Sequence, residues 1–342
     1  MHTYIFDPTT SDKASAVRGV GRYLQILKEN CSDFCTFISD LSLVPKDSIL
    51  INPFVNLIGK PLLTKRIAHT QIGVIHDLIP LQYPEHFPVG LKGKIQIWQN
   101  KRLLSLYDRF ITDSETSKKQ IIQLLGISPE KISVIYPTLA ASFWKEEKLE
   151  KTQAAPEIYC IYVGDATWNK NIVTMAQAII ESNIPCVCIG KIFSEVKNLG
   201  MMKQSPHSWQ EELWEFSKIT VNNPLFIFPG FISDTELRAY YQHALINILI
   251  SRDEGFGFSY LEASSQHCPS IIGDTLIGNE ISNGAAYFVS PEDYHQIVKI
   301  VHAVQSDTQE VNIIVEKSYT RSLFFSPFQF TNSIRVLVHK LA

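Results

Sequence analysis

Two carboxylates eight positions apart bracket a pair of glycines in the segment Ser251–Ala263. Glu254 stands before the glycines and Glu262 follows them, inside a stretch with helical spacing. Glycines at a helix start let a ligand approach the backbone, and the first helical amides, unpaired inside the helix, attract anions. The segment therefore predicts a phosphate site flanked by hydroxyl acceptors. An acidic N-terminal cap at Glu254 and a solvated Glu262 are the plainer alternative.

Two further side chains of suitable chemistry follow apolar, strand-like runs. Lys170 comes after the run Ile158–Val163 and adds a cation near the carboxyl end of that predicted strand. His76 ends another apolar run, so we expect it at the carboxyl edge of a sheet. With Asp77 it also fits a general base and its orienting carboxylate. A surface lysine and a structural histidine remain the alternatives.

Short apolar runs alternate with longer amphipathic segments along the whole chain, which predicts βαβ units and parallel sheets. Several runs are apolar at successive positions, as in strands that helices cover on both faces. The predicted strands are residues 3–6, 48–51, 72–76, 109–112, 132–135, 158–163, 185–189, 225–228, 246–250, 270–272 and 286–289. The predicted helices are residues 20–28, 114–125, 172–180, 235–243, 257–266 and 291–304.

A charged stretch without apolar periodicity, Lys145–Gln153, separates two similar halves. We therefore predict Rossmann-like domains over residues 1–152 and 153–325, with parallel sheets facing across a cleft where ligands bind. A final amphipathic helix is predicted over residues 326–342, with Ser326 as its N-cap and Pro327 at its first position.

Several short motifs, taken in order, resemble those of GT-B glycosyltransferases, specifically the large retaining family called family 4 or group 1. One motif alone would be weak support, whereas several in the right order are strong. The resemblance implies an N-terminal acceptor domain, a C-terminal nucleotide-sugar domain, and a last helix that returns to the first domain. The motifs are Gly19–Tyr23, His76–Pro80, Ser114–Ser117, Tyr162–Gly164, Lys170–Asn171, Gly230–Ile232, Glu254–Glu262, Glu280 and Ala285–Phe288.

The resemblance also implies roles for the individual residues. Glu254 would contact hydroxyls of the transferred hexose, and Glu262 would bind the ribose of the nucleotide. His76 would hydrogen-bond a hexose hydroxyl, and Lys170 would neutralise the leaving phosphates. The remaining donor-site residues would act through their backbone, with Ile232 against the base and the glycine-rich turn near the phosphates. They are Gly19, Val20, Gly21, Ile232, Gly255, Phe256, Gly257 and Phe258.

The implied function is retaining hexose transfer from a nucleotide-sugar to a glycan or lipid-linked acceptor in cell-surface polysaccharide synthesis. The segment from His76 to Glu85 is most similar to mannosyl- and rhamnosyl-type members, which makes GDP-mannose the first candidate donor. No D-x-D pair occurs in the chain. We therefore expect neither a metal ion nor another cofactor, with a basic side chain and the helix dipole in the metal's role.

Two departures from the family pattern keep a second reading open, in which the protein binds a partner or a sugar nucleotide without turnover. Asp165 stands where many members have an arginine, and His267 stands where a glycine is usual. Arg252 or Arg22 is a candidate to replace the missing cation. Among enzymes, a GT-B epimerase or phosphorylase is the rival, but the glutamate pair and the absence of a pyridoxal-lysine context speak against it.

Composition limits the remaining possibilities. A net charge of −3 argues against nucleic acid as a partner. We expect a cytoplasmic protein, because no leader and no apolar run of ~20 residues is visible. Contact with the inner face of an anionic membrane is compatible with one basic and apolar segment, for which an ordinary helix with a solvated face is the alternative. That segment contains Lys92, Lys94, Ile95, Ile97, Trp98, Lys101, Arg102, Leu103 and Leu104.

Overall fold

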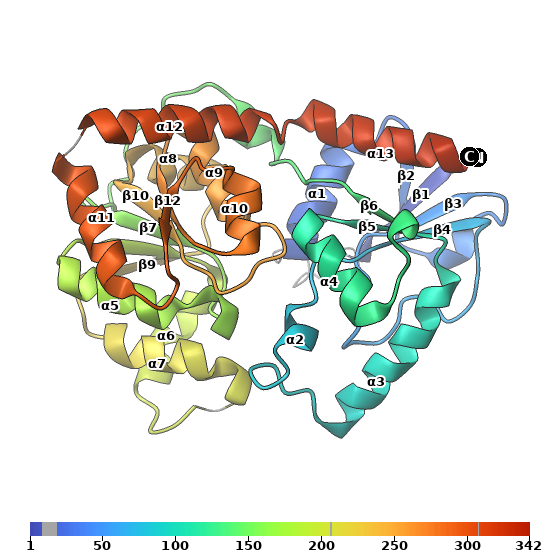
Figure 1. Ribbon diagram of the computed structural model, residues 1–342, viewed down its shortest axis with the longest axis horizontal. Coiled ribbons are helices and arrows are strands. Elements are labelled where there is room, and N and C mark those ends of the chain that lie inside the picture. The colour runs from blue at the N-terminus through green and yellow to red at the C-terminus, as the bar shows by residue number, and fades with distance from the viewer. Residues whose placement is uncertain (9–18, 206, 307) are drawn as a thin grey trace. The chain divides into compact units, whose positions relative to one another are not determined.

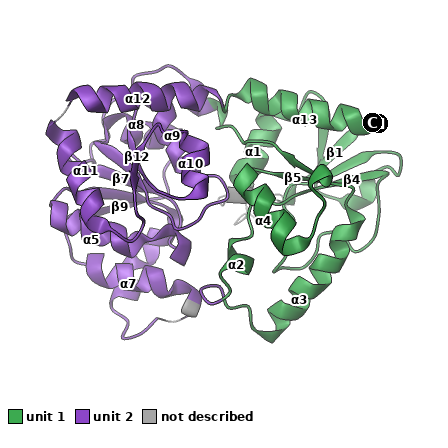
Figure 2. Ribbon diagram, viewed as in Figure 1, with its two compact units in different colours: residues 1–84, 88–141, 325–342 green, residues 85–87, 142–324 purple. Residues whose placement is uncertain are grey.

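The computed structural model of the protein describes residues 1–8, 19–205, 207–306 and 308–342. It divides into two compact units (Figure 2). Unit 1 comprises residues 1–84, 88–141 and 325–342, and unit 2 comprises residues 85–87 and 142–324. Each unit has one six-stranded parallel sheet with helices against it (Figure 1). The predicted alternation of strands and helices is confirmed. No helix in the described ranges is long and apolar enough to cross a membrane.

Unit 1 has the strand order β2-β1-β3-β4-β5-β6. Its strands are β1 (Thr3–Phe6), β2 (Cys35–Ile38), β3 (Ile49–Asn52), β4 (Thr70–Val74), β5 (Arg109–Thr112) and β6 (Ile132–Val134). Its helices are α1 (Gly19–Cys31), α2 (Ile79–Gln82), α3 (Gly90–Leu103), α4 (Glu115–Leu125) and α13 (Pro327–Leu341). The strand β2 was not expected from the sequence. It is four residues long and has two buried and two more exposed positions, so it carries little of the pattern that marks a central strand.

Unit 2 has the strand order β12-β11-β10-β7-β8-β9. Its strands are β7 (Cys160–Val163), β8 (Cys186–Ile189), β9 (Phe226–Gly230), β10 (Ile246–Leu249), β11 (Ser270–Gly273) and β12 (Tyr287–Val289). Its helices are α5 (Ile172–Ser182), α6 (Val196–Gly200), α7 (Glu211–Thr220), α8 (Asp234–His243), α9 (Phe258–Ser265), α10 (Leu276–Ser282), α11 (Tyr294–Ser306) and α12 (Thr308–Leu323). Counted within the unit, this is the order 3-2-1-4-5-6 of doubly wound nucleotide-binding sheets.

Burial on both faces of the central strands explains their sequence. All four residues of β8, and all four of β10, are buried. A strand covered by helices on both sides has no solvent-facing position, so apolar residues occupy successive places, apart from the buried Asn247 of β10, which donates to the Ser270 hydroxyl. The cysteines Cys160, Cys186 and Cys188 are unpaired thiols within this core. Burial raises the pKa of each of Cys160 and Cys186 well above its usual value, which keeps both thiols protonated.

The first unit ends at Ala141 rather than at residue 152, because the charged stretch after it binds to unit 2. The guanidinium of Arg238 in α8 donates to the carbonyl of Lys145 at 2.8 Å. The amide of Leu149 donates to Gln242 at 2.9 Å, and the Leu149 carbonyl lies 2.9 Å from Nε2 of His243. Side chains of α8 thus bind the segment that includes Lys145 and Leu149, although its charged sequence is typical of a free linker.

The chain returns to unit 1 at Phe325, and α13 packs on α1 there. Ser326 is the N-cap of α13, as expected, with its hydroxyl accepting from the amide of Gln329. The buried ring of Phe330 meets the ring of Tyr23 edge to face at 6.1 Å. This aromatic contact gives the apolar face of the final helix its partner.

His267, where a glycine is usual, adopts a positive φ of 57° in the turn after α9. A side chain with a Cβ is strained in this left-handed region, which explains why glycine suits the position. The ring of His267 stacks on Tyr319 of α12 at 4.1 Å between centroids. The ring contact offsets part of the backbone strain, and β11 follows in regular register with β10.

We predict that His267→Ala destabilises unit 2 more than His267→Gly does. Alanine keeps the strained φ and loses the contact with Tyr319, whereas glycine loses the contact and relieves the strain. The difference in free energy of unfolding between the two variants should be about 1 kcal/mol in favour of glycine. Urea unfolding of both variants measures it, and equal midpoints would show that the turn does not strain the backbone.

Candidate functional site

The strand order of unit 2 reverses at one point, between the neighbouring strands β7 and β10. From β7 the chain proceeds to β8 and β9 on one side, and from β10 to β11 and β12 on the other. In open parallel sheets, ligands bind at the carboxyl ends of the strands beside such a reversal, because the two connections diverge there. A ligand site is therefore expected in the loops that follow β7 and β10.

Two asparagines join these loops. The amide of Arg252 donates to the carbonyl of Asn169 at 2.7 Å, and Nδ2 of Asn169 donates to the carbonyl of Asp253 at 3.0 Å. Nδ2 of Asn171 lies 3.3 Å from the Ile250 carbonyl. Asn171 also has a φ of 56°, a conformation that asparagine tolerates better than most residues. The backbone between them is thereby fixed on both sides of Lys170.

The fixed loops bring Lys170 and Glu254 together. Nζ of Lys170 lies 2.6 Å from Oε1 of Glu254, and the hydroxyl of Ser251 donates to the same oxygen at 2.7 Å. The side chains are 21% and 12% exposed. Within the described part of the chain, Oε2 of Glu254 and two of the three ammonium hydrogens of Lys170 have no partner. The pair thus offers an acceptor for a hydroxyl beside donors for an anion.

The start of α9 lies directly after this pair and depends on Gly257. This residue has a φ of 104°, and a Cβ on it would lie 2.7 Å from Cδ1 of Ile281. Gly257 is the N-cap, and no side chain caps the helix. The amides of Phe258 and Ser259 accordingly have no partner inside the helix, which suits an anion. Glu254 is not a cap, so the alternative reading of that residue is wrong.

Glu262 lies inside unit 2 rather than in solvent. Glu262 is 6% exposed, and its Oε2 accepts a hydrogen bond from the Tyr241 hydroxyl at 3.2 Å. The reading of Glu262 as a solvated helix residue is therefore wrong. The predicted role of Glu262 toward a ribose stays a prediction.

The other predicted backbone contacts fall at three places. Gly255 and Phe256 are buried in the loop before α9. Ile232 is half-buried after β9, beside Phe231, whose side chain is 72% exposed. Gly19, Val20 and Gly21 form the first turn of helix α1 rather than a separate glycine-rich turn, and the side chain of Val20 lies outside the described residues.

The structure does not favour Arg252 as the substitute phosphate cation. Its guanidinium lies 2.6 Å from Glu292 and 3.6 Å from Glu212, donates to the carbonyl of Trp168, and sits over the Trp168 ring. Two carboxylates already balance its single charge. Asp165 is exposed, and its Oδ1 accepts from the amide of Ala166. The cation nearest to Glu254 in the described loops is thus Lys170.

His76 lies in unit 1, just after β4, where protein acceptors occupy both of its ring nitrogens. Nδ1 is 2.6 Å from Oδ2 of Asp113, and Nε2 is 3.0 Å from the carbonyl of Pro53. Its ring lies edge to face with Tyr23 at 4.6 Å and stacks on Phe54 at 6.0 Å. Asp113 is itself buried, with a side chain 4% exposed.

These surroundings favour the imidazolium form. Burial opposes the positive charge, but the charge and hydrogen bond of Asp113, the charge of Asp77 and the Pro53 carbonyl outweigh it and raise the pKa of His76 above 6.5. A doubly protonated ring has no lone pair to accept a proton, so this arrangement does not favour a general base. The carboxylate that hydrogen-bonds the ring is Asp113 rather than Asp77, whose Oδ1 accepts from the Ile79 amide.

Sequence reasoning missed Asp113 as the partner of His76. A signal for it exists, because Asp113 directly follows β5, and β4 and β5 are neighbours in the sheet. Carboxyl ends of adjacent parallel strands meet at one edge, so residues just after each strand lie close together.

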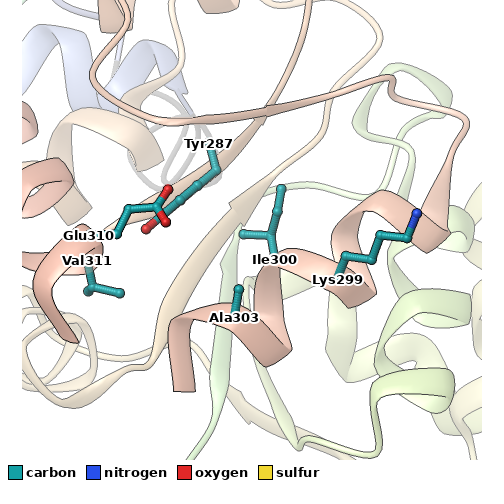
Figure 3. A pocket seen from close by; sticks show the side chains of 6 residues that line it. All are labelled: Tyr287, Lys299, Ile300, Ala303, Glu310 and Val311. Atoms are coloured by element: carbon teal, nitrogen blue, oxygen red, sulfur yellow. The ribbon is translucent and has the colours of Figure 1, made fainter. Parts of the chain in front are cut away.

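Two cavities lie at the helical surface of unit 2, and none of the predicted site residues is among their described lining residues. One of about 210 Å³ lies between α11 and α12 (Figure 3). Its walls are Tyr287, Lys299, Ile300, Ala303, Glu310 and Val311. Within the described ranges, no group of three or more His, Cys, Asp or Glu side chains is arranged to hold a metal ion.

Two protein-family models match the chain. The family described as "Glycosyl transferases group 1" matches residues 145–321, just over half of the chain. The family described as "Glycosyltransferase Family 4" matches residues 61–141. The first match contains both loops of the candidate site.

Similar proteins include two O-antigen enzymes. The O-antigen chain mannosyltransferase RfbU of Salmonella typhimurium is 27% identical over 66% of this chain and 58% of its own length. The O-antigen chain mannosyltransferase B of Escherichia coli is 22% identical over 69% of this chain and 62% of its own. The alignment thus spans about three fifths of each of these relatives.

Solved structures share the fold over most of the chain. Alr3699/HepE of Anabaena, crystallised in complex with UDP, has a TM-score of 0.72 at 13% identity and covers 99% of this chain and 100% of its own. Sucrose-phosphate synthase of Thermosynechococcus elongatus has a TM-score of 0.61 at 16% identity, over 80% of this chain and 68% of its own. At such identities the likeness is one of fold.

We predict that Lys170→Met weakens binding of GDP or UDP about 10- to 100-fold, the range expected when one or two hydrogen bonds from a charged group are lost. Titration calorimetry on the full chain measures the dissociation constant. Lys197→Met, an exposed lysine in α6, is the matched control and should leave it unchanged. Equal affinity of both variants for nucleotide would contradict a phosphate contact by Lys170.

We predict that the contribution of His76 to stability depends on pH. Its pKa is raised in the folded state, so this contribution is fully present below pH 6.5 and is lost as the pH rises through the folded pKa. The unfolding free energy of the wild type should fall relative to His76→Gln by at most about 1.4 kcal/mol per pH unit in that window.

Denaturant unfolding between pH 6 and pH 9 tests this expectation. Asp113→Asn removes the carboxylate that favours the charged ring, so it should move the loss toward lower pH. Parallel stability curves for wild type and His76→Gln would show that the ring carries no extra proton in the folded state.

Proposed function

This chain belongs to the group 1 glycosyl transferases, and we propose that it transfers a hexose from a nucleoside diphosphate sugar to a glycan or lipid-linked acceptor, with retention at the anomeric carbon. The observation that carries the proposal is the Lys170–Glu254 pair at the strand-order reversal of unit 2. The pair combines a hydroxyl acceptor with an anion-binding cation, which are the two features that a sugar diphosphate requires.

In the proposed reaction, the bond between the anomeric carbon and the diphosphate oxygen breaks while the acceptor oxygen bonds to the same carbon from the same face. Lys170 and the first amides of α9 stabilise the negative charge that develops on the diphosphate. The departing phosphate oxygen receives the proton of the acceptor hydroxyl, so no side chain has to act as a base. This fits a His76 whose ring nitrogens both have acceptors.

Glu254 is assigned to the sugar. Its Oε1 is already held by Lys170 and Ser251, so Oε2 is oriented before the donor arrives. A preoriented acceptor for a hexose hydroxyl fixes the anomeric carbon relative to the phosphate site, and positioning of this kind supplies a large part of catalysis. We propose that Lys170 and the helix dipole take the role that a divalent metal has in other transferases.

GDP-mannose is the proposed donor, and cell-surface polysaccharide synthesis is the proposed context. Support comes from the two relatives named as O-antigen chain mannosyltransferases. The similar fold of HepE, solved with UDP and with UDP-glucose, makes a uridine nucleotide the alternative that an assay has to include. We propose that the protein acts in the cytoplasm, at the inner face of the membrane, where lipid-linked acceptors are found.

We predict transfer or slow hydrolysis of GDP-mannose in the presence of EDTA, with the α configuration of the donor kept in the product. Proton NMR of the anomeric signal reads the configuration at early times. Glu254→Gln should lower kcat/KM about 100-fold or more, as expected when a contact that strengthens in the transition state is lost.

The matched control is Glu292→Gln, which removes an exposed carboxylate that pairs with Arg252 and leaves Glu254 in place. It should keep kcat/KM within about twofold of the wild type. A product with the β configuration would contradict retention, and activity only with added Mg²⁺ would contradict metal independence. Turnover of UDP-sugars but not of GDP-mannose would show that the donor is a UDP-sugar.

A further inference from the structure

Helix α3 of unit 1 presents large apolar side chains to the outside. Leu91, Ile95 and Trp98 are 81%, 57% and 55% exposed. They are spaced by four and three positions, so they share one helix face. Figure 1 shows α3 running along the outside of unit 1, away from the strands of its sheet. A continuous apolar face on the surface of a folded domain usually marks an interaction site.

The opposite face of α3 is fixed to the unit, so this exposure is built into the fold. Gly93 and Asn100 are the buried residues of the helix. Nδ2 of Asn100 donates to the carbonyls of Leu57 and Gly59, both at 2.8 Å. A Cβ at Gly93 would lie 2.5 Å from Cβ of Val89, the N-cap of the same helix, so a larger residue would crowd the first turn. The hydrogen bonds of Asn100 thus hold the helix by its polar side, with its apolar side outward.

Positive charge surrounds the apolar face. Lys92, Lys94, Lys101 and Arg102 are exposed, and α3 contains no acidic residue. The guanidinium of Arg102 lies 3.9 Å from the centre of the Trp98 ring. The chain as a whole has a net charge of −3, so this helix is basic within an acidic protein. The partner that fits such a face is both apolar and anionic.

We propose that α3 is a membrane-binding element that lies on an anionic lipid bilayer, with Leu91, Ile95 and Trp98 in the interfacial region and the basic side chains among the headgroups. A helix that lies in the plane of the interface gains free energy from the apolar side chains that it buries there and from the attraction of its basic side chains to anionic lipids. A nucleic acid would leave the three apolar side chains without a partner. A second copy of the same face would place like charges together.

This proposal goes beyond sugar transfer and does not rest on it, because vesicle binding needs neither donor nor acceptor. Its functional consequence is a higher local concentration of the protein where lipid-linked acceptors lie. Binding to the surface through unit 1 leaves the Lys170–Glu254 site of unit 2 chemically unchanged, so membrane binding and nucleotide binding can be measured separately.

The test is flotation of the full chain with vesicles of phosphatidylglycerol and phosphatidylcholine, compared with vesicles of phosphatidylcholine alone. The wild type should float only with the anionic vesicles, and NaCl should weaken binding, because salt screens charges at the surface. Lys92→Gln with Lys94→Gln should weaken binding about 30-fold, equivalent to ~2 kcal/mol at ~1 kcal/mol for each basic side chain.

The variant that replaces Leu91, Ile95 and Trp98 by serine should lose binding altogether, while GDP or UDP binding by calorimetry stays as in the wild type. Leu43→Ser, at another exposed apolar residue of unit 1, is the matched control and should float like the wild type. The proposal is overturned if the wild type ignores anionic vesicles or if the serine variant binds them equally. If the wild type does not bind vesicles but forms a dimer that the serine variant does not form, the apolar face binds a second copy of the chain instead.

Discussion

The position of Asn169 between two loops is the constraint on which the candidate site depends. Its carbonyl and its side-chain amide bind Arg252 and Asp253, two successive residues of the loop after β10. These two hydrogen bonds align the loop after β7 with the loop after β10, at the point where the strand order reverses. The ammonium of Lys170 and the carboxylate of Glu254 then meet at 2.6 Å without any help from a ligand.

A basic side chain held against a carboxylate occurs in each unit, and burial makes the two cases different. Lys170 and Glu254 retain some contact with solvent and keep unused donors and an unused acceptor within the described residues. His76 and Asp113 are more deeply enclosed, and both ring nitrogens of His76 are occupied. The first pair keeps polar groups that a ligand can use, whereas the ring of the second pair is fully engaged by the protein. A charge fixed in this way still influences nearby groups, since burial reduces screening.

Much of the architecture was predictable because it follows from local pattern. Four successive apolar residues in β8, and an apolar run in β10 that only Asn247 interrupts, indicate central parallel strands, and Ser326-Pro327 indicates a helix start. The prediction of two doubly wound parallel sheets, the GT-B fold of the group 1 glycosyl transferases, is confirmed. The strand β2 was missed because four residues at a sheet edge carry almost no periodicity. The end of unit 1 was misplaced because Arg238 and Gln242 hold a charged segment that looks like a linker.

The site was less predictable because side-chain pairing depends on topology. The sequence separates Lys170 from Glu254, and His76 from Asp113, and only the order of strands brings each pair together. The placement of Lys170, Glu254 and Gly257 near the carboxyl ends of strands could be inferred from the sequence. The ion pairs of Arg252 with Glu212 and Glu292 could not. The left-handed backbone conformation of His267 could not be predicted from the sequence either.

The central claim, that the loops after β7 and β10 hold the sugar diphosphate, is tested most directly by hydrogen exchange of the full chain with and without GDP-mannose and UDP-glucose. A ligand that binds there should slow amide exchange in residues 164–171 and 250–259 together, because it bridges the two loops. Slowing in both segments with either ligand is the result this account predicts. Slowing only elsewhere, with either nucleotide sugar bound, would contradict it.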